Sequence, residues 1–152
     1  MFRGRTERGS CRMVAALFAL LWSISPGSRA QDVDSRQAWN ELNSRVVAAY
    51  QAGKYAGATT LAQEALELAR RSFGDEDPAT LTSMNNLARL YRSQGRYGEA
   101  EPLFVKCLEA TRRVLGEEHP DTLTSINSLA MLYSYQGGYG EAEPLYVKCL
   151  ET

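Results

Sequence analysis

The chain has 152 residues, of which 44% are apolar and 23% charged, and its formal net charge is −1. This composition is typical of one ordinary globular domain and excludes a disordered or fibrous protein. From residue 31 onward the chain carries 12 basic and 17 acidic side chains, a net charge of −5. This acidic balance excludes nucleic acid and anionic membranes as partners held by bulk charge.

The N-terminal segment has the pattern of a secretion signal. Arginines precede an apolar run over residues 13–22, and a Pro–Gly turn follows. Small residues at Ser28 and Ala30 suit the −3 and −1 positions of a cleavage site. We therefore expect a signal peptide over residues 1–30, cleavage after Ala30, and export to a periplasm or to the extracellular space. The alternative is an uncleaved membrane anchor over residues 13–24, although a span needs roughly 20 apolar residues.

Residues 31–36 are expected to form a linker, and the sequence after it repeats itself. Residues 91–109 read YRSQGRYGEAEPLFVKCLE and residues 133–151 read YSYQGGYGEAEPLYVKCLE, identical at 15 of 19 positions with an offset of 42. A weaker copy lies upstream at the same offset. A fixed period of this size predicts a stacked array of repeats. We expect an array over residues 37–152, with copies over 37–74, 78–116 and 120–152, the last one incomplete.

Each copy contains two helix patterns. In the second copy, apolar residues recur at steps of three and four from Leu81 to Tyr91. Asp77 is placed to cap this helix, and Pro78 suits its first position. A second apolar stripe begins near Gly98, and so short a linker requires antiparallel neighbours. No strand pattern follows, so the predicted fold class is all-α, a solenoid of helix-turn-helix repeats.

The pattern within each copy resembles the tetratricopeptide repeat. The residues that carry the resemblance are Leu87, Ala88, Tyr91, Gly95, Tyr97, Ala100, Phe104 and Cys107, with Leu129, Ala130, Tyr133, Gly137, Tyr139, Ala142, Tyr146 and Cys149 in the third copy. The 42-residue period, the LGEEHPDTL loop and the NNLA helix are similar to the repeats of kinesin light chain and of many bacterial repeat proteins. The first copy departs from the pattern, with Arg45 where leucine is expected. The resemblance implies a right-handed superhelix whose first helices line a concave groove.

The resemblance also implies a scaffold or adaptor that binds a protein or peptide segment in that groove. The groove residues that we predict are Asn43, Asn85, Asn86, Arg89, Arg92, Asn127 and Ser128. Three of the asparagines recur at the 42-residue offset, and an amide can both donate to and accept from the main chain of a peptide. The alternative is that these asparagines are inherited with the repeat or pack between helices. The two arginines lie one turn apart and are predicted to hold a carboxylate together, with a solvated surface as the alternative.

The sequence contains no catalytic or metal-binding constellation. The only histidine, His119, precedes a proline, and Cys107 and Cys149 occupy equivalent positions that we interpret as core. Stacked helices lie about 8–10 Å apart, beyond the reach of a disulfide between these two thiols. We therefore expect no enzyme activity, no cofactor, no metal and no small-molecule substrate.

A second hypothesis makes the array the recognition arm of a longer enzyme, such as a caspase-like peptidase, whose effector domain is absent from this chain. The last copy lacks the final turns of its second helix and a polar cap, which repeat arrays generally need. We therefore expect the chain to be a fragment of a longer array. Self-association through the uncapped last repeat is the alternative.

Overall fold

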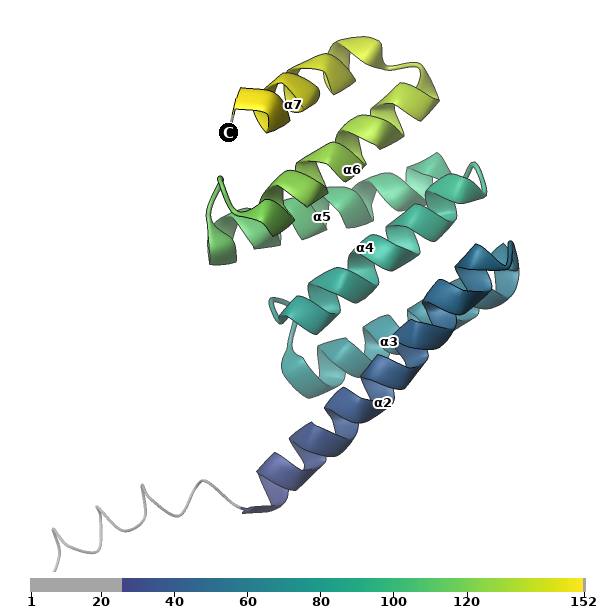
Figure 1. The fold of residues 1–152 in the computed structure, drawn as a ribbon, viewed down its shortest axis with the longest axis vertical. Coiled ribbons are helices and arrows are strands. Elements are labelled where there is room, and N and C mark those ends of the chain that lie inside the picture. The colour runs from purple at the N-terminus through teal and green to yellow at the C-terminus, as the bar shows by residue number, and fades with distance from the viewer. Residues whose placement is uncertain (1–25, 152) are drawn as a thin grey trace, which may run out of the picture. The chain divides into compact units, whose positions relative to one another are not determined.

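The computed structural model describes residues 26–151, with side chains from Asp32 onward, and it contains six α-helices over this range. The helices, shown in Figure 1, are α2 (Pro26–Gln51), α3 (Tyr55–Phe73), α4 (Pro78–Ser93), α5 (Tyr97–Leu115), α6 (Pro120–Gln136) and α7 (Tyr139–Glu151). All contacts discussed below lie within the compact unit that runs from Ser35 to Thr152. The all-α prediction is confirmed, because no described residue forms a strand.

The predicted signal peptide lies mostly outside the described residues. Its last five residues, 26–30, and the predicted linker over 31–36 belong to the first part of α2. The linker prediction missed this helix because no glycine or proline interrupts the sequence between Gly27 and Gln51. Nowhere in the described range is a helix both long and apolar enough to cross a membrane. Cleavage after Ala30 and export stay predictions.

Consecutive helices pack against each other from α3 to α7, and α4 also contacts α6. Hydrogen bonds such as Asn86 to Asn43 join α4 to α2. The first helices of the three repeats, α2, α4 and α6, therefore form one row of neighbours. In Figure 1, α3 and α5 lie behind this row. The predicted pattern of antiparallel helix pairs is confirmed.

The helix ends follow from local sequence. The Asp77 carboxylate accepts a hydrogen bond from the Ala79 N–H at 2.8 Å, which caps α4 as predicted. His119 caps α6 in the same way, since its Nδ1 accepts from the Asp121 N–H at 3.1 Å. At the end of α5, Gly116 has a φ of 91°, a conformation that costs a side-chain-bearing residue energy. The same devices thus begin and end equivalent helices in successive repeats.

The core is continuous from the first to the third repeat. Its largest fully buried apolar side chains are Phe104, Leu90, Ile126 and Leu132. Cys107 is buried and Cys149 is half-buried against the same core, and both thiols are free. The prediction that these cysteines are packing residues is therefore confirmed for Cys107 and holds in part for Cys149.

Candidate peptide-binding face

The seven predicted groove residues lie on the row of first helices. Asn43 is on α2, four of them are on α4, and Asn127 and Ser128 are on α6. We call the exposed side of this row the first-helix face. The repeat brings the residues to adjacent helices, but it does not give them the same surroundings.

Two of the asparagines bind each other. Asn86 Nδ2 donates to Asn43 Oδ1 at 2.8 Å, and both side chains are half-buried between α4 and α2. This pair realises the alternative in which asparagine packs between helices. Each amide has two N–H donors and two lone pairs and uses only one of these in this bond, so each still has hydrogen-bonding capacity left.

The equivalent pair in the next repeat is not formed. Ser128 takes the place of Asn86, is buried, and donates to the Thr124 carbonyl of its own helix at 2.9 Å. Asn85 takes the place of Asn43, and its Oδ1 is buried with no hydrogen-bond partner among the described residues. Asn127 is exposed, and its Nδ2 makes only a weak contact with Met131 Sδ at 3.9 Å. Asn127 is therefore the amide with most hydrogen-bonding capacity exposed to a ligand, whereas the Asn85 oxygen is unpartnered among the described residues but buried.

Arg89 and Arg92 point to different neighbours. The Arg89 guanidinium lies 5.6 Å from the ring centroid of Tyr50 on α2, and that of Arg92 lies 5.4 Å from the ring centroid of Tyr135 on α6. The two arginines are thus not arranged to hold one carboxylate together. Within the described part of the chain, neither forms an ion pair with an acidic side chain.

The first-helix face is positively charged beside Tyr50. The Tyr50 hydroxyl lies 3.3 Å from Ser93 Oγ. This hydrogen bond, and after it the charges of Arg89 and Arg92, lower the pKa of Tyr50 despite its partial burial. A hollow of about 170 Å³ opens between α2 and α4 next to this ring, and Val47, Gln51 and Arg89 help to line it. The surface therefore combines a shallow apolar hollow with two cations.

The Cys107 thiol has a structural role. Cys107 Sγ donates to the Leu81 carbonyl at 3.6 Å, and burial raises the pKa of this thiol, so it stays protonated and unreactive at neutral pH. Across residues 32–151, no three His, Cys, Asp or Glu side chains gather where a metal ion could bind.

Of the two tyrosines that define this face, Tyr50 was missed from the sequence, whereas the sequence already placed Tyr135 on the groove side of its helix. They stand at different positions of the repeat, since Tyr50 aligns with Arg92 and Tyr135 aligns with Ser93 at the 42-residue offset. Alignment of the copies shows equivalent residues, whereas these contacts join non-equivalent positions. A search for aromatic residues one position away from the equivalent residue in another copy could have found Tyr50.

The tetratricopeptide repeat model matches three consecutive segments, which cover residues 42–79, 80–121 and 122–152. The chain belongs to the tetratricopeptide repeat family. Its repeats are of the kind found in kinesin light chain, as the resemblance implied. No curated protein matches the chain.

Solved structures of similar repeat proteins share this fold. BtubC (BKLC) from P. vanneervenii is 18% identical with a TM-score of 0.67, over 90% of this chain and 59% of that one. A putative kinesin light chain from Podosopora anserina, with nearly identical tetratricopeptide-like repeats, is 27% identical with a TM-score of 0.69, over 76% of this chain and 54% of that one. The tetratricopeptide array described here thus spans little more than half the length of these structures.

Proposed function

We propose that this tetratricopeptide protein binds an extended acidic peptide segment across the first-helix face and so acts as a scaffold or adaptor. The observation that carries the proposal is the state of Arg89 and Arg92. Each is stacked over a tyrosine, and neither is neutralised by a carboxylate of the described residues. By contrast, Arg36, Arg70, Arg96 and Arg112 all form ion pairs.

Stacking prepares the guanidinium groups for a ligand. A ring beneath a guanidinium restricts its motion and leaves the N–H edge available to accept a carboxylate in fork geometry. Because Arg89 leans toward α2 and Arg92 toward α6, the face has two separate cationic positions, one on each side of α4. A ligand with two acidic side chains, one for each position, fits this arrangement best.

An amide beside the arginines suits the main chain of such a peptide. Asn127 is exposed, and its Nδ2 makes only a weak contact with Met131 Sδ. A backbone N–H of the ligand would satisfy an amide oxygen, and a backbone carbonyl would accept from an amide nitrogen. Such contacts do not depend on the side chains of the ligand, so selectivity among peptides rests on the arginines and on the hollow beside Tyr50.

The proposal is tested by selecting binders from a display library of random twelve-residue peptides against the full chain. We expect the selected peptides to be enriched in Asp and Glu. The affinity of the strongest one, labelled with fluorescein and measured by anisotropy, should fall about tenfold in Arg89→Gln and in Arg92→Gln, the worth of one charge-assisted hydrogen bond. It should also weaken with added salt.

Arg71→Gln is the matched control, because Arg71 is an exposed arginine on α3, outside the first-helix face. Its affinity should equal that of the wild type. Selection of neutral or basic peptides, or equal losses in all three variants, would contradict the proposal.

A further inference from the structure

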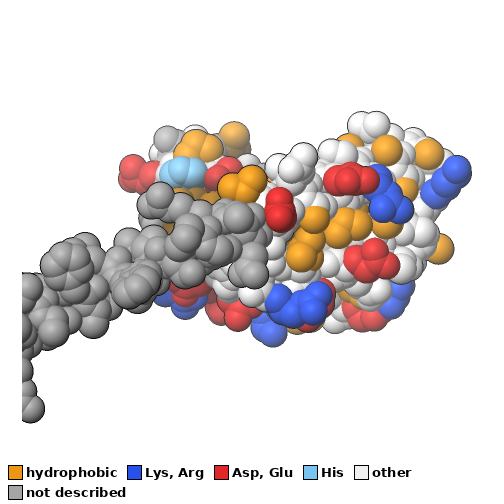
Figure 2. All heavy atoms as spheres, turned by 90° about the horizontal axis from the view of Figure 1, so that it is seen from below, with side chains coloured by type: hydrophobic (Ala, Val, Ile, Leu, Met, Phe, Trp, Pro, Cys, Tyr) orange, Lys and Arg blue, Asp and Glu red, His pale blue; other side chains and the backbone are white. Residues whose placement is uncertain are grey.

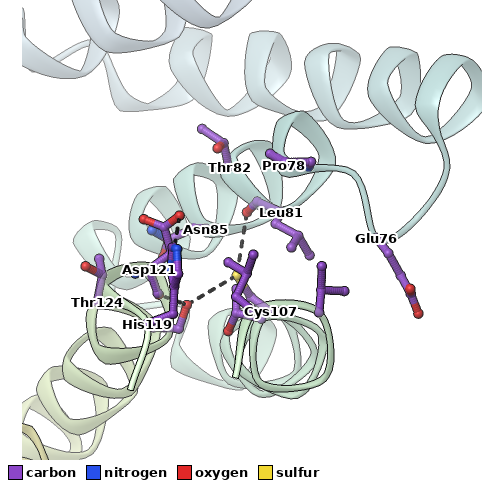
Figure 3. A pocket seen from close by; sticks show the side chains of 13 residues that line it. Glu76, Pro78, Leu81, Thr82, Asn85, Cys107, His119, Asp121 and Thr124 are labelled. Atoms are coloured by element: carbon purple, nitrogen blue, oxygen red, sulfur yellow. Dashed lines mark hydrogen bonds and ion pairs between the residues drawn. The ribbon is translucent and has the colours of Figure 1, made fainter. Parts of the chain in front are cut away.

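A second cavity, of about 300 Å³, lies between α4, α5 and α6. This volume is at the lower end of the range for ligand pockets. Leu81, Cys107 and Leu115 contribute apolar surface. Figure 3 shows Cys107 opposite Leu81, whose carbonyl accepts a hydrogen bond from the thiol. The cavity is therefore large enough for one long side chain.

The polar lining of this cavity favours a cation. Asp121 lines it together with Glu76, whose carboxylate is ion-paired with Arg113, and no lysine or arginine is among the lining residues. Figure 2 shows acidic side chains on both sides of the histidine that lies near its mouth. Asn85 also lines it, with the buried Oδ1 that has no partner among the described residues. A buried acceptor left without a donor costs about 1–3 kcal/mol, which a donor from a ligand would recover.

The preceding repeat shows which group such a site holds. Arg36 stands 42 residues before Pro78, one of the residues that line the cavity. Its guanidinium lies 3.8 Å from the ring centroid of Phe73 and donates to both Asp77 oxygens, at 2.9 and 3.1 Å. Phe73 and Asp77 stand 42 residues before Leu115 and His119, which also line the cavity. The first interface between repeats thus fills this position with an arginine of the chain itself.

In the second interface, smaller residues stand at the equivalent positions. Proline replaces Arg36, leucine replaces Phe73, and leucine at position 81 replaces Trp39, whose Nε1 donates to Ser83 Oγ at 2.7 Å in the first interface. Each replacement is smaller than the residue it replaces. The cavity is the space that these replacements leave. His119 replaces Asp77, while Asp121 supplies a carboxylate where the first interface has Ala79. The Asn85 oxygen has no partner among the described residues.

We propose that this cavity binds the guanidinium group of an arginine side chain in the peptide ligand. The inference rests on the proposed function and adds to it: the ligand carries an arginine for the cavity as well as acidic residues for Arg89 and Arg92. A neutral aromatic side chain is the competing occupant, because the first interface has the indole of Trp39 where the second has Leu81. The Asp121 carboxylate at the rim and the absence of lysine and arginine from the lining favour the cation.

The test uses small probes and the full chain, so it needs no identified ligand. Nα-acetyl-arginine amide is titrated into ¹⁵N-labelled protein and followed by two-dimensional NMR. We expect saturable shifts of the Asn85 side-chain amide and of the Thr82 and Ser125 amides. Nα-acetyl-citrulline amide, a neutral isostere, should bind about tenfold more weakly, because its hydrogen bonds lack the charge. Tighter binding of Nα-acetyl-tryptophan amide than of the arginine probe would overturn the proposal.

Two variants locate the binding. Asn85→Leu removes the orphan acceptor and should weaken binding of the arginine probe about tenfold, whereas Asn40→Leu, at an exposed asparagine on α2, should leave it unchanged. Pro78→Arg combined with His119→Asp copies Arg36 and Asp77 into the second interface. This double variant should abolish probe binding and raise Tm, because the introduced arginine side chain then fills the cavity.

Far-UV circular dichroism checks that each variant is folded, and a folded double variant that still binds the probe would overturn the proposal. Arg89→Gln and Arg92→Gln should not affect binding of the arginine probe. If the unmodified chain binds the arginine probe but selects no acidic peptide, that result would contradict the proposed function alone. The reverse result would contradict the cavity proposal alone.

Discussion

Single residues differ between repeats in ways that change their partners. Asn86 reaches Asn43 across the first interface, but the shorter Ser128 bonds within its own helix and leaves the Asn85 oxygen without a partner among the described residues. The Asn86–Asn43 bond joins residues 43 apart in sequence, one more than the repeat period. The recurrence of asparagine was visible in the sequence, but its partners depend on which residue follows it.

Ser128→Asn should restore the missing pair and stabilise the protein. An asparagine there can reach Asn85 Oδ1 as Asn86 reaches Asn43, and we expect the free energy of unfolding to rise by about 1 kcal/mol. Asn86→Ser makes the reverse change and should lower it by about the same amount. Urea denaturation of both variants measures the effect. A destabilised Ser128→Asn would show that the second interface has no room for the amide.

Whole helices were easier to predict than the contacts between them. Apolar spacing, Asp77, Pro78 and the glycine turns place α4 to α7 to within a few residues, because these signals act within one helix. The start of α2 was missed, since nothing in residues 31–36 either requires or forbids a helix. The directions of Arg89 and Arg92 were missed as well, because they depend on rings contributed by neighbouring helices.

The stability that Asp77 gives to the start of α4 should depend on pH in the acid range. The bonds from Arg36, and next the Ala79 N–H, lower the pKa of this carboxyl against the effect of burial. The folded pKa lies below the unfolded value of about 3.9, so the stabilisation is complete above that pH and is lost as pH falls through the folded pKa. Asp77→Ala should cost about 1 kcal/mol at pH 7 from the lost cap, with the lost ion pair added to it.

Asp77→Asn separates the two contributions, because asparagine caps a helix about as well as aspartate but carries no charge. Its cost at pH 7 should be smaller than that of Asp77→Ala and should disappear as pH falls below about 3.9. Urea unfolding at a series of pH values gives both curves. A cost that stays constant from neutral to acid pH would show that the charge of Asp77 contributes nothing.

Across the whole array, nearly identical helices have different surroundings. Residues 97–109 of α5 and 139–151 of α7 differ only at Phe104 and Tyr146. α5 packs against both α4 and α6, whereas α7 packs against α6 alone among the described helices. As a result Leu108 is 4% exposed and its equivalent Leu150 is 86% exposed. Position in the array, rather than sequence, therefore decides how much apolar surface each helix buries.

This difference predicts unequal stability for two helices of almost the same sequence. Local opening requires less free energy where fewer apolar contacts are lost, so the amides of α7 should exchange with solvent at least about tenfold faster than those of α5. Hydrogen–deuterium exchange with mass spectrometry compares residues 97–109 and 139–151 directly, because their intrinsic exchange rates are nearly equal. Protection of α7 that rises with protein concentration would show a second copy covering it. Equal protection of both helices at the lowest concentration would instead contradict the prediction, because the contacts of α7 with α6 would then suffice to hold it as firmly as α5.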